Sequence, residues 1–121
     1  LFLDNLDRLE KDEASLKPLL EILGGLKQKW PGARFVGNRG FSHLTQLRGT
    51  LDGVLFENLT DKAFSLKDRE WVREQLLNLQ DTEVFALDYE TRRDGEEATK
   101  LRERFSGMHY CCAPDESLQS L

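Results

Sequence analysis

Three carboxylates, Asp4, Glu57 and Asp88, each come directly after a short apolar run of the sequence. Paired carboxylates are the minimum apparatus of glycoside hydrolysis, in which one protonates the leaving oxygen and the other attacks the anomeric carbon or activates a water molecule. A further negative charge nearby raises the pKa of a carboxyl group and keeps it protonated near neutral pH. The three acids therefore predict carboxylate chemistry, with Asp88 either supplying this charge or binding substrate.

Other polar residues also follow apolar runs and widen the range of possible chemistry. They are Asp7, Asn38, Arg39, Asn58 and Tyr89. Loops that lead from strands into helices are polar in any case, and Asp or Asn there often caps a helix. The same acids could hold a divalent cation through oxygen atoms, but neither an aspartate-rich calcium loop nor a set of histidine ligands accompanies them. We therefore expect no metal site and no cofactor.

Apolar residues recur with two different periods along the chain. Leucines spaced three and four apart predict a helix over residues 15–29, with Ser15 as its N-cap. Ser65 and Asp68 form the pattern of a capping box before a second long helix, and Asp94 marks the start of a third. Short runs that are apolar throughout predict strands at residues 1–3, 34–37, 53–56, 84–87 and 108–112.

Strands without alternation of apolar and polar residues are typical of a parallel sheet that is covered on both faces. Parallel neighbours need a crossover, and here each crossover is a predicted helix. A five-stranded doubly wound sheet fits the length of the chain, whereas a (β/α)8 barrel needs roughly 200 residues or more. Because the chain opens directly on a strand, we interpret residues 1–114 as the C-terminal part of a TIM barrel whose first strands are missing, followed by a tail over 115–121.

In both architectures the carboxyl ends of parallel strands share one edge, where active sites lie. The polar residues at the strand ends are therefore expected to converge. Four strings carry these residues in order: FLDNLD at 2–7, VGNRGF at 36–41, DGVLFENL at 52–59 and ALDY at 86–89. Together they resemble glycoside hydrolase family 114, the endo-α-1,4-polygalactosaminidases, and are most similar to the hydrolase domains of bacterial Pel polysaccharide proteins.

The resemblance implies a (β/α)8 barrel that hydrolyses α-1,4-linked galactosamine or partly acetylated galactosamine polymers. It also implies Asp4 and Glu57 as the catalytic pair, with Asp4 expected to be the nucleophile and Glu57 the general acid/base. An extracellular or periplasmic location is implied as well. Residues expected to line the sugar subsites are Asp7, Asn38, Arg39, Asp88 and Tyr89, and Tyr110 near the end of the last strand is a further candidate for stacking on a sugar ring.

The charge balance limits the classes of partner. A formal net charge of −5 and a pI near 5.1 argue against general attraction to nucleic acid, and an acidic surface suits a cationic aminosugar polymer. No apolar run approaches the roughly 18 residues of a membrane span. Two other functions remain open: a barrel that binds carbohydrate without cleaving it, and a metal-dependent hydrolase on a doubly wound sheet.

Overall fold

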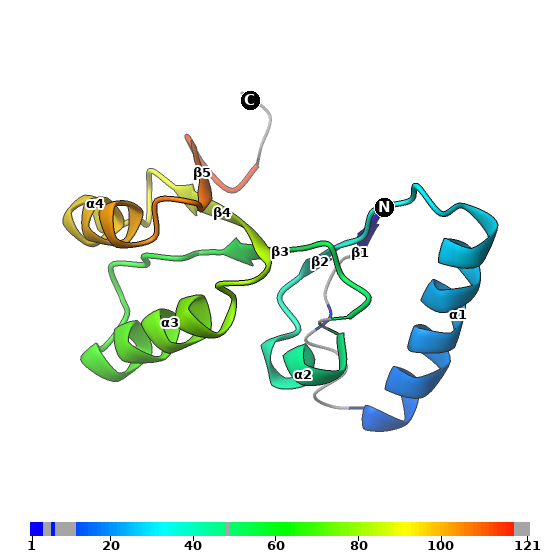
Figure 1. The fold of residues 1–121 in the computed structure, drawn as a ribbon. Coiled ribbons are helices and arrows are strands. Elements are labelled where there is room, and N and C mark those ends of the chain that lie inside the picture. The colour runs from blue at the N-terminus through cyan, green and yellow to red at the C-terminus, as the bar shows by residue number, and fades with distance from the viewer. Residues whose placement is uncertain (4–5, 7–11, 48, 118–121) are drawn as a thin grey trace. The chain divides into compact units, whose positions relative to one another are not determined.

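The computed structural model describes residues 1–3, 6, 12–47 and 49–117. Strands and helices alternate along the chain (Figure 1). The strands are β1 (Phe2–Leu3), β2 (Val36–Asn38), β3 (Gly53–Glu57), β4 (Glu83–Tyr89) and β5 (His109–Ala113). The helices are α1 (Leu16–Lys29), α2 (Leu44–Leu47), α3 (Leu66–Asn78) and α4 (Gly95–Arg104), with 3-10 turns at Glu13–Ser15 and Phe41–His43.

The sheet order follows the chain, β1-β2-β3-β4-β5. β1 pairs with β2 in parallel, and β4 pairs with β5 in parallel over five residue pairs. Five parallel strands alternating with helices confirm the predicted α/β class. The chain divides into two compact units, residues 1–54 and residues 55 onward, and each is described by itself. Among the described residues, none of the helices combines the length and apolar character needed to cross a membrane.

The first long helix, α1, begins after Ser15, which occupies the N-cap position as predicted. Ser15 also ends the preceding 3-10 turn and is in the right-handed helical conformation. Its side chain does not cap the helix; its hydroxyl donates instead to Asp12 Oδ2 at 2.6 Å. Leu23 is the one fully buried residue of α1, so this helix contributes a narrow face to the core.

Asp52, just before β3, organises the strand entries of the first unit. Its carboxylate accepts from the Phe35 backbone N–H at 2.7 Å and pairs with Lys27 of α1 at 3.1 Å. Burial acts to raise the pKa of Asp52, but the Phe35 hydrogen bond and the Lys27 charge outweigh it and hold this pKa below its ordinary value. The carboxylate therefore stays charged and ties α1 to the start of the strands.

In the second unit, both long helices are capped by the residues that the sequence indicated. Ser65 Oγ accepts from Asp68 N at 3.2 Å, and Asp68 accepts from Ser65 N at 2.8 Å, so the predicted capping box is confirmed. Asp94 caps α4 by accepting from the N–H groups of Glu96 and Glu97, each at 3.1 Å. These caps satisfy helical donors that would otherwise lack partners.

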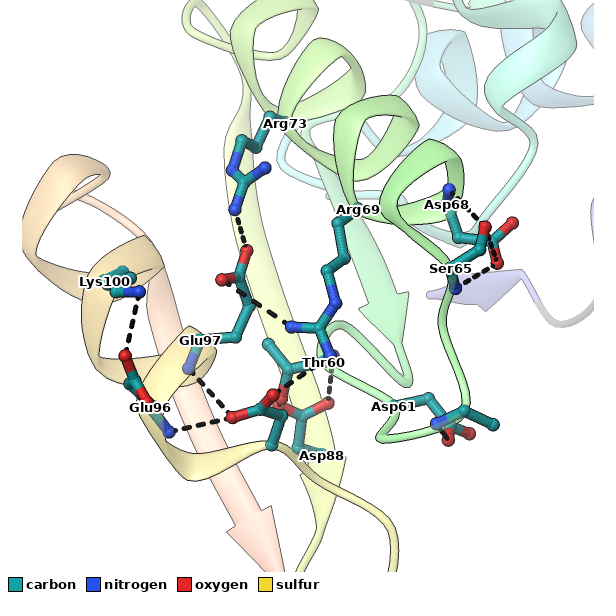
Figure 2. A network of polar contacts seen from close by, with 12 residues as sticks. Thr60, Asp61, Ser65, Asp68, Arg69, Arg73, Asp88, Glu96, Glu97 and Lys100 are labelled. Carbon is teal, nitrogen blue, oxygen red and sulfur yellow. Dashed lines mark hydrogen bonds and ion pairs between the residues drawn. The ribbon is translucent and has the colours of Figure 1, made fainter.

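A cluster of ion pairs joins α3 to α4 (Figure 2). Arg69 contacts Asp94 at 3.0 Å and Glu97 at 3.7 Å, and Arg73 donates to the other oxygen of Glu97. Glu97 is 6% exposed, so its charge depends on these two arginines. Apolar residues of the two helices, including Val72 and Leu101, are buried beside this cluster.

β4 is longer than predicted because its ladder with β5 continues to the pair Tyr89↔Ala113. Asp88 and Tyr89 are therefore strand residues rather than loop residues, and successive strand side chains point to opposite faces. After β5 the chain remains in contact with the unit, since Arg92 donates to Glu116 at 2.7 Å. The expected tail thus includes an ion-paired residue, and its last part, 118–121, lies outside the described residues.

Candidate active site

Glu57 is the last residue of β3 and is partly buried. The chain turns sharply after it, because Asn58 adopts a left-handed conformation with φ of 57°. Asparagine tolerates this region better than most residues. The Asn58 N–H donates to Leu87 O of β4 at 2.8 Å, so the turn is held against the neighbouring strand. The backbone on both sides of Glu57 is thereby fixed.

Tyr89 of β4 holds the Glu57 side chain. Its hydroxyl donates to Glu57 Oε1 at 2.6 Å, and its side chain is 3% exposed. Within the described part of the chain, this is the one hydrogen bond of the Glu57 side chain. One carboxylate oxygen therefore accepts from Tyr89, and the other makes no hydrogen bond to the residues that the structure describes.

Asp88 lies in the interior with 1% exposure. Its Oδ1 accepts from Thr60 N at 3.1 Å, and its Oδ2 accepts from Thr60 Oγ at 2.6 Å and from Tyr110 Oη at 2.9 Å. A carboxylate enclosed in this way cannot contact a sugar without movement of the surrounding residues. The structure gives Asp88 a positioning role: it anchors Thr60, three residues beyond Glu57, to β4 and β5.

Tyr110 of β5 contacts one residue through its hydroxyl and another through its ring. Its hydroxyl donates to Asp88, and the Arg102 guanidinium lies 4.8 Å from the centre of its ring. Burial, opposed by a hydrogen bond from Arg93 and reinforced by the charge of Asp88, raises the pKa of Tyr110 to about 12. The hydroxyl therefore remains a donor throughout the physiological pH range. Arg102 thus already lies over one face of the ring that was predicted to stack on a sugar.

The loop after β3 is tied to the loop after β4 by further contacts within the second unit. Asp94 N donates to Thr60 O at 2.6 Å, and Asp61 forms a β-bridge with Arg93. Asp61 also accepts from Ala63 N at 2.9 Å and from Arg92. Figure 2 shows Thr60 and Asp61 within this network, beside Asp88. The loop that carries Glu57 into α3 is therefore rigidly supported.

Asn38 and Arg39 close β2 in the first unit. Asn38 is 8% exposed, and Arg39 and Gly40 both have left-handed φ values, 64° and 80°. A side chain at Gly40 would meet Leu6 Cβ at 2.9 Å, so glycine allows Leu6 to approach the backbone closely here. The positive φ of Gly40 also favours glycine at this position.

Two predicted site residues, Asp4 and Asp7, lie outside the described residues. Of the remainder, the structure brings Glu57 into contact with Tyr89 and Asp88 into contact with Tyr110. Thr60 was missed as a supporting residue, and no local pattern marks it, because its contact with Asp88 depends on strand pairing. Among the described residues, no group of three or more His, Cys, Asp or Glu side chains is arranged to hold a metal ion.

No protein-family model matches the sequence, and no curated protein matches it significantly. Solved structures do match the chain. The glycoside hydrolase domain of PelA from Pseudomonas aeruginosa matches the whole chain with a TM-score of 0.71 and 26% identity. A variant of that domain in which a glutamate is replaced by alanine matches with a TM-score of 0.70 and 28% identity.

The chain spans 55% of the length of each of these structures. An identity of 26–28% over the whole chain, together with a shared fold, is consistent with the strings quoted from the sequence. The structure thus confirms the predicted resemblance: this α/β chain is similar to part of the TIM-barrel glycoside hydrolase domain of PelA.

Proposed function

We propose that this chain forms part of a glycoside hydrolase that cleaves α-1,4-linked galactosamine-rich polysaccharide with a pair of carboxylates. The observation that carries the proposal is the state of Glu57. It stands at the carboxyl end of a parallel strand, with one oxygen held by Tyr89 and the other without a protein contact in the described part of the chain. In (β/α)8 enzymes this end of the sheet supplies the catalytic residues.

In this proposal Glu57 is the general acid/base and Asp4 the nucleophile. Glu57 protonates the leaving oxygen while Asp4 forms a bond to the anomeric carbon; Glu57 then takes a proton from water as the glycosyl bond to Asp4 is hydrolysed. The assignment of Asp4 rests on the family resemblance. The similarity to a glycoside hydrolase domain over the whole chain supports the reaction class.

The remaining residues are proposed to act around this pair. Asp7 follows β1 in the sequence, Asn38 ends β2 and Arg39 follows it, and all three are assigned to sugar contacts. Tyr110 is assigned a contact with a sugar ring. The net charge of −5 favours a cationic aminosugar polymer over an acidic one. Such a substrate implies that the protein works outside the cytoplasm, in the periplasm or beyond the cell.

The test is product release by the protein in its natural length. Incubation with an α-1,4-galactosamine polymer is expected to yield short oligosaccharides, detected by mass spectrometry. Glu57→Gln is expected to abolish release while leaving polymer binding intact. Full activity in this variant would contradict the proposal. Binding without cleavage by the unaltered protein would instead favour a carbohydrate-binding barrel.

A further inference from the structure

Two consecutive residues at the end of β4 contact the segment 57–60, which comprises the last residue of β3 and the start of the loop after it. Tyr89 donates to the Glu57 carboxylate at 2.6 Å, and Asp88 binds both the backbone N–H and the hydroxyl of Thr60. Since adjacent strand residues point to opposite faces, β4 reaches this segment from both sides of the sheet. Both side chains are almost fully buried, at 3% and 1% exposure.

We infer that Tyr89 is a positioning residue that sets the orientation of Glu57, with Asp88 and Thr60 fixing the backbone behind it. This inference rests on the proposed function of Glu57. Tyr89 is buried, and it acts on the reaction through the carboxylate to which its hydroxyl donates.

The hydrogen bond has a defined geometric consequence. It restricts the orientation of the Glu57 side chain. This restriction matters because a misplacement of about 1 Å at a catalytic group can cost a factor of about 100 in rate. A residue that donates a proton in one step and accepts one in the next has to keep its place in both steps.

The alternative is that Tyr89 only fills space at the end of β4. In that case the Tyr89 ring would contribute to packing, and its hydroxyl would bond to Glu57 only because a buried donor needs an acceptor. Tyr110 provides the comparison, because it is the other tyrosine of the chain and its hydroxyl donates to Asp88 rather than to Glu57. Tyr89→Phe and Tyr110→Phe remove the same atom from neighbouring strands.

The experiment measures kcat and KM for the natural-length protein and both variants on a galactosamine polymer. Tyr89→Phe is expected to lower kcat between about 10- and 100-fold with little change in KM. Tyr110→Phe keeps the ring and removes a hydroxyl that bonds to Asp88 rather than to Glu57, and it is expected to lower kcat less than Tyr89→Phe does.

A second readout does not depend on activity. In crystal structures of the variants, the Glu57 side chain is expected to take another orientation in Tyr89→Phe and to keep its orientation in Tyr110→Phe. An active enzyme in which Tyr89→Phe lowers kcat no more than Tyr110→Phe does, or in which Glu57 keeps its place in Tyr89→Phe, would overturn the inference. If the unaltered protein is inactive but Glu57 still moves in Tyr89→Phe, the hydrolase proposal is refuted and the positioning contact is established.

Discussion

Replacing Asp88 gives a quantitative test of the support behind Glu57. In Asp88→Ala, three hydrogen bonds from Thr60 and Tyr110 are lost at a position with 1% exposure. The two hydroxyl groups can rotate toward other acceptors, but the backbone N–H of Thr60 cannot. An unsatisfied buried donor costs about 1–3 kcal/mol, and each lost hydrogen bond to a charged group contributes about 1.5 kcal/mol or more. The free energy of unfolding is expected to fall by about 3–5 kcal/mol.

Asp88→Asn separates the hydrogen bonds from the charge. The amide oxygen still accepts from Thr60 N, and the amide nitrogen can donate to both hydroxyls, because each hydroxyl also accepts. The loss in free energy of unfolding is therefore expected to stay below about 1.5 kcal/mol. A large part of the carboxylate's stabilising effect is thus expected to come from its hydrogen bonds and not from its charge.

Urea unfolding provides the measurement. The chain has one tryptophan in each unit, Trp30 and Trp71. In a Trp30→Phe background, the fluorescence of Trp71 reports on the unit that contains Asp88. A free energy of unfolding of Asp88→Ala within about 0.5 kcal/mol of the parent value would refute this account of the buried network. If Asp88→Asn were as unstable as Asp88→Ala, the charge of Asp88 and not its hydrogen bonds would hold the loop.

Three further predictions concern the two units separately. Gly40→Ala is expected to cost about 2–4 kcal/mol in thermal unfolding, because it combines a φ of 80° with a contact to Leu6 Cβ; Gly37→Ala meets only leucine methyl groups and should cost less than Gly40→Ala. Glu97→Ala is expected to cost about 2–4 kcal/mol, because it leaves two arginines facing a buried gap, and a denaturation curve superimposable on the parent would contradict this. The Ala63 N–H and Arg92, acting against burial, hold the pKa of Asp61 below its ordinary value. Its stabilising contribution is therefore complete above about pH 4 and lost as the pH falls further, and Asp61→Asn should flatten the acid side of the stability curve.

Local patterns predicted most of the secondary structure. The capping box at Ser65 and Asp68 was correct because a helix cap depends on residues a few positions apart, which a sequence displays directly. Ser15 was also placed correctly at the N-cap of α1, but the preceding 3-10 turn and the bond from its hydroxyl back to Asp12 were not predicted. The apolar runs located the strands to within a few residues.

The sequence predicted which types of residue form the candidate site, but it did not predict the contacts between them. That Glu57 ends a strand followed from the apolar run before it. That Tyr89 bonds to Glu57, and Asp88 to Thr60, follows from the pairing of strands distant in sequence, which no local pattern encodes. The extension of β4 through Tyr89 likewise comes from its ladder with β5. Tyr89 and Asp88, which were predicted to line a sugar subsite, thus contact Glu57 and Thr60 in the structure.

The most direct test of the central claim compares two substrates in Glu57→Gln. If Glu57 protonates the leaving oxygen, this variant should lose a factor of about 100 to 10,000 on the polymer and far less on an aryl galactosaminide, whose leaving group needs no proton. Glu83→Gln, at the opposite end of β4, should match the unaltered protein on both substrates. Equal losses on the two substrates, or none, would contradict the assignment of Glu57 as the acid.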